Sequence, residues 1–187
     1  MFRRERDRYV KWIGILGGAV AGVAAIAAAV PILKKRTRSA ITILKKDHRA
    51  VSFLFGALRH TTNSSIRKSI FRQVRTRIET HMWVEEEIFY PAVRNIYTTS
   101  AEQQVDQAKL EHQQMKDLLH QVGIIDANSF SFMSKINELK EVFENHVDGE
   151  ENQLFPFAQD NMSSEEIDYL GQLIHDQKLE LGEKAAA

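Results

Sequence analysis

Cysteine is absent from this chain of 187 residues. Its absence excludes disulfide bonds, thiolate zinc sites, cysteine-ligated iron–sulfur clusters and cysteine nucleophiles. Any metal ion must therefore be held by nitrogen and oxygen atoms. Proline (3 residues) and glycine (9 residues) are scarce, and the apolar residues recur at helical rather than alternating spacing. The sequence therefore predicts an almost entirely α-helical protein.

A net charge is also lacking, because 25 basic residues balance 25 acidic ones. A neutral chain gives no electrostatic reason to expect nucleic acid as a partner. The charge is unevenly spread, since most of the charge in the first fifty residues is positive. The length suits one well-buried domain with an appendage.

The appendage is an apolar segment near the N-terminus, residues 12–33, WIGILGGAVAGVAAIAAAVPIL, which has no charged side chain. Its length suits a helix that crosses a bilayer core of about 30 Å. Basic clusters flank it on both sides, and Lys45, Lys46 and Arg49 favour a cytoplasmic C-terminal domain. We therefore expect a single-pass membrane protein in which residues 1–38 form a basic N-terminus, a transmembrane anchor and a basic linker.

Two other interpretations of this segment remain open. Ala27, Ala28 and Ala29 suit a signal peptidase, although the basic residues that follow are unfavourable for export. The segment could also be an Ala/Gly-rich helix buried in the domain. Gly14, Gly18 and Gly22 lie on one helix face, a spacing that lets two such helices approach closely in lipid and predicts self-association.

The remainder of the chain is patterned as amphipathic helices joined by short loops. Apolar spacing predicts four long helices within residues 39–160 and a short C-terminal helix within residues 161–187. Ser100 with Gln103, and Ser163 with Glu166, have the spacing of capping boxes at helix starts. Short loops favour antiparallel neighbours, so we expect an all-α, up-down four-helix bundle with a short fifth helix.

An internal repeat lies within this helical part. HMWVEEEIFYP, residues 81–91, matches HVDGEENQLFP, residues 146–156, with histidine first, glutamates four and five positions later, and proline at the tenth step. Upstream, His48 and His112 each follow an acidic residue at similar distances before these segments. The chain therefore contains two copies of one helix pair.

Helical geometry selects the residues of the repeat that face inward. Advancing four residues turns a helix by about 400°, so His81 and Glu85 share one face with Ile88, and His146 shares a face with Glu150. Two buried ionised glutamates would each cost several kcal/mol, a large part of a typical domain stability of roughly 5–15 kcal/mol. A bound cation removes this conflict.

The predicted ligand set contains one histidine from each bundle helix and two glutamates. Its members are His48, His81, Glu85, His112, His146 and Glu150. This set exceeds what a tetrahedral zinc site uses, and mixed nitrogen and oxygen ligation suits iron or manganese. If both glutamates bridge two ions, each ion receives two histidines, and positions stay open for a bridging solvent and a small exogenous ligand.

These residues resemble the hemerythrin-like HHE cation-binding domain, over residues 39–160. The resemblance implies a four-helix bundle around a non-haem di-iron centre with an oxo or hydroxo bridge. Together with the apolar segment 12–33, it implies a membrane-anchored protein that binds or reacts with dioxygen, peroxide or nitric oxide. If the protein is an enzyme, it is a di-iron oxidoreductase acting on peroxide, nitric oxide or ferrous iron. The alternatives are an iron- or oxygen-sensing module without turnover and an interaction protein with a purely structural metal.

The sequence departs from the oxygen carriers of that family at two points. Those proteins have a further histidine four residues after the one on the third helix, where this chain has Lys116. They place the last carboxylate at the position of Glu151, whereas we expect Glu150 because the first repeat has the same spacing. Lys116 either extends to solvent or places a positive charge near a bound ligand, and Tyr90 either packs in the bundle or hydrogen-bonds a ligand.

Several other polar residues lie beside the predicted ligands. Asp47 and Glu111 directly precede ligand histidines and are candidates to orient imidazoles. Neighbouring residues on a helix diverge by about 100°, however, which favours solvated acids at both positions. Glu86 is expected to face solvent or a neighbouring helix. The remaining histidines, His60, His120 and His175, lack repeat counterparts and are expected outside the site.

Overall fold

The computed structural model of this protein describes residues 39–186, with side chains to residue 182. The predicted membrane-spanning segment, residues 12–33, lies outside the described residues, together with Gly14, Gly18 and Gly22. Within the described part of the chain, no helix combines the length and the apolarity needed to cross a bilayer.

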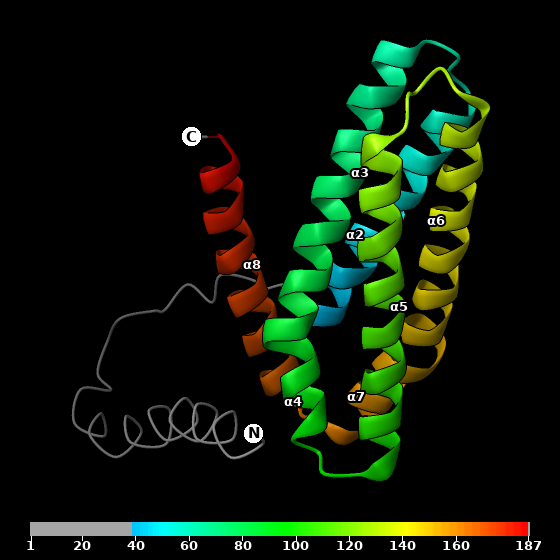
Figure 1. Cartoon of the computed structure of the whole chain (residues 1–187). Helices are drawn as coiled ribbons and strands as arrows, with labels where there is room; N and C mark the ends of the chain where they lie inside the picture. The colour runs from blue at the N-terminus through cyan, green and yellow to red at the C-terminus, as the bar shows by residue number, and fades with distance from the viewer. Residues whose placement is uncertain (1–38, 187) are drawn as a thin grey trace, which may run out of the picture. The chain divides into compact units, whose positions relative to one another are not determined.

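The described residues are helical and contain no β-strand, which confirms the predicted all-α class. Figure 1 shows four long helices running alternately up and down. They are α2 (Ala40–Arg59), α3 (Ser64–Val84), α5 (Thr99–Ile124) and α6 (Phe130–Gly149). Shorter elements continue α3 and α6, namely η1 (Glu85–Phe89), α4 (Tyr90–Arg94), η2 (Glu150–Leu154) and α7 (Phe155–Asn161). The last helix is α8 (Ser164–Ala186).

Helix starts are capped by polar side chains, one of them as predicted. The backbone N–H of Glu166 donates to Ser163 Oγ at 3.2 Å, and the N–H of Ser163 donates to Glu166 Oε2 at 2.8 Å, which confirms that capping box. At α5 the cap is Thr98, whose Oγ1 accepts from the N–H of Ala101 at 3.1 Å. The predicted role of Ser100 in starting this helix was therefore wrong by two residues.

A wide π-helical turn interrupts each of the two helices that carry the repeated segment. Pro91 and Pro156 have no N–H to donate to the carbonyl four residues earlier. The residue before each proline instead donates its N–H to the carbonyl of the glutamate five residues earlier. The extra residue turns the following helix by about 100°. Phe89 is consequently buried, whereas Ile88, predicted on the inner face, is only partly buried and packs against the cluster that contains Phe89.

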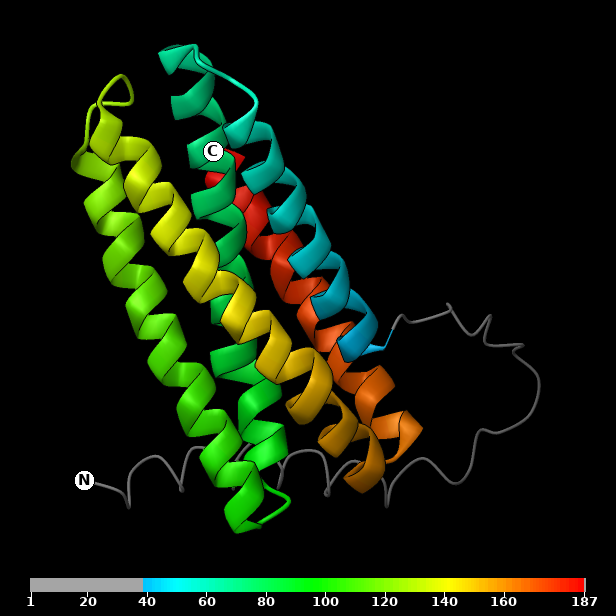
Figure 2. The same ribbon diagram turned by 90° about the vertical axis from the view of Figure 1, so that its right-hand side faces the viewer.

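The C-terminal helix α8 was predicted to be short, but it is 23 residues long. Gly171 lies inside it and is buried. Ile167, Leu170 and Ile174 are also buried on α8. The helix contacts α2, α3 and η1, and Figure 2 shows it running alongside α2. The domain is therefore a four-helix bundle with a fifth long helix packed on one side.

The bundle core consists of two apolar clusters with a polar layer between them. One cluster includes Val51, Ile78 and Phe143, and the other includes Leu44 and Phe155. Among the described residues, the buried polar side chains are His48, His81, Glu85, His112, His146 and Glu150, each at most 2% exposed. These are the six predicted ligands, and the structure brings them together in one layer.

Candidate metal centre

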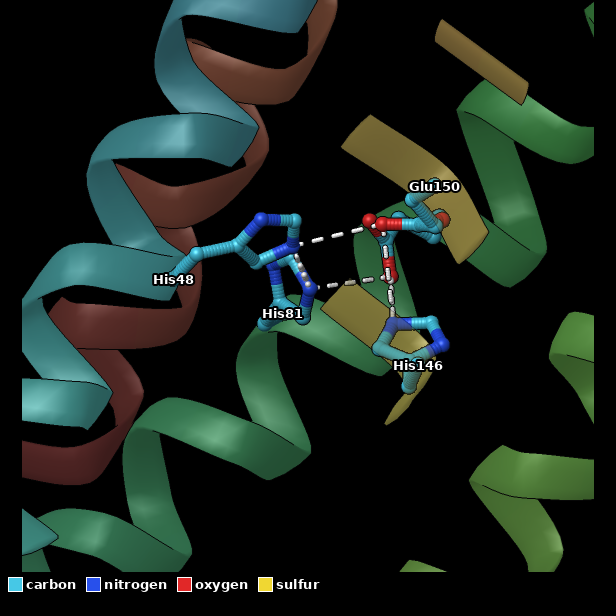
Figure 3. A group of neighbouring side chains, drawn as sticks. His48, His81, His146 and Glu150 are labelled. Carbon is cyan, nitrogen blue, oxygen red and sulfur yellow. Dashed lines mark hydrogen bonds and ion pairs between the residues drawn. The ribbon is translucent and has the colours of Figure 1, made fainter. Parts of the chain in front are cut away.

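The six buried polar residues come from all four bundle helices. The histidines lie on α2, α3, α5 and α6, and Glu85 and Glu150 begin the π-helical turns η1 and η2. Figure 3 shows His48, His81, His146 and Glu150 pointing toward one another from these elements. π-Helical turns occur frequently at functional sites, and here each one starts at a buried glutamate.

Every imidazole directs its Nε2 atom to the centre, close to a glutamate oxygen. The distances are 3.2 Å and 3.3 Å from Glu85 Oε2 to His81 and His112, and 3.3 Å and 3.5 Å from Glu150 Oε2 to His48 and His146. His48 Nε2 and His81 Nε2 lie 3.0 Å apart. Potential ligand atoms of five of these residues, all except His112, lie within 4.8 Å of one another. This compactness suits a cluster that surrounds metal.

An outer set of carboxylates faces the other ring nitrogen, Nδ1, of each histidine. The distances are 2.9 Å for His48 with Glu151, 2.8 Å for His112 with Glu86, 3.3 Å for His146 with Glu111 and 3.7 Å for His81 with Asp47. The first three are short enough for hydrogen bonds, and the last is longer than a hydrogen bond. An Nδ1–H that donates outward leaves the Nε2 lone pair directed at the centre, which is the tautomer that binds metal.

The outer carboxylates follow the internal repeat. Within each repeat, the acidic residue that precedes the histidine of the first helix faces the histidine of the second helix. Asp47, for example, faces His81. The second glutamate of each repeated segment faces the first-helix histidine of the other repeat, as Glu151 faces His48. The two repeats are thus tied together by exchanged contacts around one centre.

These contacts decide several predictions from the sequence. Solvation of Asp47 and Glu111 was the favoured prediction and was wrong, because their partner histidines lie on neighbouring helices. Glu86 faces a neighbouring helix, one of the two outcomes expected. Between Glu150 and Glu151, the structure places Glu150 in the centre and Glu151 at the outer nitrogen of His48.

Lys116 points away from the centre. Its Nζ donates to both carboxylate oxygens of Glu86, at 2.7 Å and 3.0 Å, and its side chain is 43% exposed. The alternative that it places a positive charge beside a bound ligand was therefore wrong. Lys45 lies 3.4 Å from Glu151, and Lys178 pairs with Asp47, so lysines support three of the four outer carboxylates.

Tyr90 breaks the symmetry between the repeats. Its hydroxyl is buried, donates to Glu150 Oε1 at 2.8 Å and lies 3.1 Å from His112 Nε2. The residue at the matching position of the second repeat is Phe155, which stacks on His48 with ring centroids 5.9 Å apart. The sequence shows this difference, a tyrosine before one proline and a phenylalanine before the other, but it does not show the contact of Tyr90 with Glu150.

Burial and mutual repulsion govern the protonation of the centre. Burial raises the pKa of Glu85 well above its ordinary value, and the neighbouring charge of Glu150 adds to this effect. Burial also opposes ionisation of Glu150, but the nearby imidazoles of His146 and His48 lower its pKa overall. Burial lowers the pKa of His81 to about 3. Without a cation, these shifts favour a protonated Glu85 beside a neutral His81.

The donor atoms of the centre fit a metal ion. Both carboxylate oxygens of Glu85, the Nε2 of His146 and the Oε2 of Glu150 are buried without a hydrogen-bond partner among the described residues. A buried polar atom without a partner costs roughly 1–3 kcal/mol, so such atoms call for an explanation. A cation bound by these nitrogen and oxygen atoms supplies the missing partner, and the donor set suits iron or manganese.

Comparisons with known proteins show the family and support the fold. The sequence model of the Hemerythrin HHE cation binding domain matches residues 39–158. A solved structure of a protein from Mycobacterium kansasii that contains such a domain superposes with a TM-score of 0.68. It is 23% identical and covers 78% of this chain and 89% of its own, which supports the fold.

Two curated proteins are similar in sequence. A DNA nickase of Nostoc sp. is 29% identical over 126 residues, which are 67% of this chain and 35% of the nickase. An uncharacterized hemerythrin-like protein of Schizosaccharomyces pombe is 26% identical over 132 residues, 71% of this chain and 64% of that protein. The chain thus spans less than two thirds of both relatives. Because the family model matches most of the chain, this protein belongs to the Hemerythrin HHE cation-binding domain family.

Proposed function

We propose that the centre binds two non-haem iron ions, and that the protein binds or reacts with dioxygen, hydrogen peroxide or nitric oxide there. One observation carries this proposal: four inward Nε2 atoms and two buried glutamates form a single layer in which several donor atoms lack partners. The six donors are neutral imidazoles and carboxylates, which are ligands of redox-active iron in proteins.

The arrangement of the layer supports two ions rather than one. His48 and His81 form one close pair, with ring centroids 4.7 Å apart, and His112 and His146 form another at the same separation. Glu85 approaches one member of each pair, and so does Glu150. Each pair would therefore hold one ion, and both glutamates would be shared. Iron bound in this way supplies one-electron redox chemistry and open positions for a small ligand.

The protein residues around the centre orient it and keep it dry. The outer carboxylates fix the imidazole rings through Nδ1, and the Tyr90 hydroxyl holds Glu150 through Oε1. Phe89 and Phe155 are fully buried next to the layer and exclude water from the His48 side.

A sensing role is the second candidate, and the unpartnered buried groups favour it. A metal-free bundle contains Glu85 with both oxygens unsatisfied, so metal occupancy must change the stability of the domain. A change in stability can control binding to a partner without turnover. In either role, residues 12–33 would anchor the domain to a membrane, with the bundle on the cytoplasmic side.

Metal analysis of the purified full chain tests the proposal. We expect about two iron ions per chain and a visible absorption band that shifts on addition of azide, because mixed imidazole and carboxylate ligation favours iron. The His81→Ala variant should lose iron, whereas His120→Ala, which changes an exposed histidine outside the centre, should keep it. A single zinc ion per chain without a redox response would refute both roles.

Turnover separates the two candidate functions. An enzyme consumes peroxide or nitric oxide continuously, and the His81→Ala variant does not. A sensor shows iron-dependent resistance to proteases without sustained consumption. Equal consumption by the wild-type protein and His81→Ala would remove the catalytic role.

A further inference from the structure

A polar cleft leads from the protein surface to the centre on the side of the second repeat. It has a volume of about 480 Å³ and lies between α5 and the junction of α6 with η2. Its lining includes His146, Glu150 and Glu111, so residues of the centre and of the outer carboxylates form its inner wall. His146 Nε2 and Glu150 Oε2 are buried there without hydrogen-bond partners. The cleft therefore ends at a wall behind which these unpartnered atoms lie.

The lining of the cleft is rich in amides and has no cation among its members. The amide side chains are Gln103, Gln104, Gln107, Asn145 and Gln153. Amides both donate and accept hydrogen bonds, which suits a small polar molecule. Asp148, Glu111 and Glu150 also line the cleft, and their carboxylates repel anions. An apolar gas would gain nothing from the amides.

The corresponding face of the first repeat is closed. At four matching positions its residues are apolar where the cleft has glutamine or glycine. Gln104, Gln107, Gly149 and Gln153 correspond to Ala40, Ile43, Val84 and Ile88. Ala40 and Val84 belong to one buried cluster with residues of α8, and Ile43 and Ile88 pack against that cluster.

Helix α8 covers this first-repeat face. It contacts α2, α3 and η1, and Figure 1 shows it on the side of the bundle away from α5 and α6. Ile167 and Ile174 of α8 are buried in the cluster that contains Val84. Lys178 of α8 pairs with Asp47, the counterpart of Glu111. One side of the pseudo-symmetric centre is thus sealed by α8, and the other keeps a polar opening.

We propose that the cleft between α5 and the α6–η2 junction admits and positions a small, uncharged, hydrogen-bonding ligand, for which hydrogen peroxide is the probe. The amides replace the water shell of the ligand, and the absent cations select against anions. The inference rests on the proposed function, because the ligand reaches the metal centre. Beyond the proposed function, it names the route by which the ligand enters and the class of ligand that the cleft accepts.

Single cysteines test the route without any metal. The wild-type chain has no cysteine, so an introduced thiol is the sole one in the protein. Ala108 is 4% exposed and lines the cleft, and its counterpart Leu44 is fully buried beneath the closed face. Iodoacetamide is small, uncharged and polar, and its reaction is followed by mass spectrometry. We expect Ala108→Cys to react at least about tenfold faster than Leu44→Cys, because a sealed thiol reacts only when the fold opens.

A bulky residue at Gly149 should close the cleft. Gly149 lines it, and a Cβ atom there would meet no atom within 4 Å. Gly149→Phe should therefore slow the labelling of Ala108→Cys. Gly56→Phe is the matched control, since Gly56 is an exposed helical glycine with equally open space, and it should leave the rate unchanged. Circular dichroism checks that both chains are folded, and Gly149→Leu is used if the phenylalanine variant does not fold. Equal labelling rates of Ala108→Cys with and without the substitution at Gly149 would overturn the route.

The iron-loaded full chain tests the ligand. We expect Gly149→Phe to retain the iron content of wild type but to slow the spectral change on mixing with hydrogen peroxide, and Gly56→Phe to match wild type. Equal rates in Gly149→Phe and wild type would refute the entry route. A chain that binds no iron refutes the proposed function instead, and the cysteine experiment then still decides whether the cleft is the open side.

Discussion

Glu86 provides a direct test of whether the outer carboxylates tune the metal centre. It accepts from His112 Nδ1 at 2.8 Å and from Lys116 Nζ at 2.7 Å and 3.0 Å. Glu86→Gln keeps the size of the side chain but removes its charge. The His112 ring then loses its charged acceptor, although its Nε2 still faces Glu85.

The size of the effect follows from these contacts. Although burial alone would raise it, the bonds to His112 and Lys116 lower the pKa of Glu86 to about 2. A shift from 4.5 to that value corresponds to at most about 3 kcal/mol, and solvent screening of this partly exposed group reduces it to about 1 kcal/mol. This contribution is present above pH 4.5 and is lost as the pH falls toward 2. Loss of such an outer contact typically weakens metal binding by about 10- to 100-fold.

Two measurements on the same variant check these values. Competition with a chelator should show iron affinity reduced within that range in Glu86→Gln. Urea unfolding of the metal-free chain at neutral pH should show a loss of about 1 kcal/mol. Glu87→Gln changes the adjacent exposed glutamate and is the matched control. Wild-type iron affinity in Glu86→Gln would refute the idea that Glu86 orients His112 for metal binding.

Three further predictions concern the inner layer. The pKa of His81 is lowered to about 3, so below pH 6.5 the unfolded chain binds a proton that the folded chain does not. The free energy of unfolding of the metal-free protein in urea should therefore fall by up to about 1.4 kcal/mol per pH unit from pH 6.5 toward 3. In His81→Gln it should fall less steeply. Tyr90→Phe should destabilise the protein by about 1–3 kcal/mol, because Glu150 Oε1 loses its hydrogen-bond donor, and it should alter the visible spectrum of the iron form. Tyr97→Phe, at an 84% exposed position, should do neither. Glu85→Leu should abolish iron binding yet raise the melting temperature of the metal-free chain, because it removes a buried carboxylate with no hydrogen-bond partner; a lower melting temperature would contradict this.

The inner layer could be predicted from the sequence because its members obey local rules. A spacing of four residues places His81 and Glu85 on one helix face whatever the rest of the fold does. The repeat then identified His146 and Glu150 independently of the first pair. The partial burial of Ile88 could not be predicted from uniform helical turns, although Pro91 indicated a disturbance of the helix.

The outer carboxylates could not be predicted in the same way. The contact of Asp47 with His81, or of Glu86 with His112, depends on which helices are neighbours and on their relative height. Spacing along one helix contains neither quantity. The role of α8 was missed for a related reason, since its buried residues are recognisable only once the apolar face of α2 and η1 that they cover is known.

The two departures from repeat symmetry meet at one carboxylate. Tyr90 belongs to the first repeat, yet its hydroxyl donates to Glu150 of the second. Glu150 also lines the inner wall of the cleft, and its other oxygen is buried without a hydrogen-bond partner. One oxygen of Glu150 is therefore held by a protein hydroxyl while the other faces the centre and the incoming ligand. The His48 side is closed by α8 and Phe155 and the His146 side is lined by amides, so the centre is asymmetric although its six inner residues are symmetric, and a ligand that enters through the cleft would meet the His112–His146 pair first.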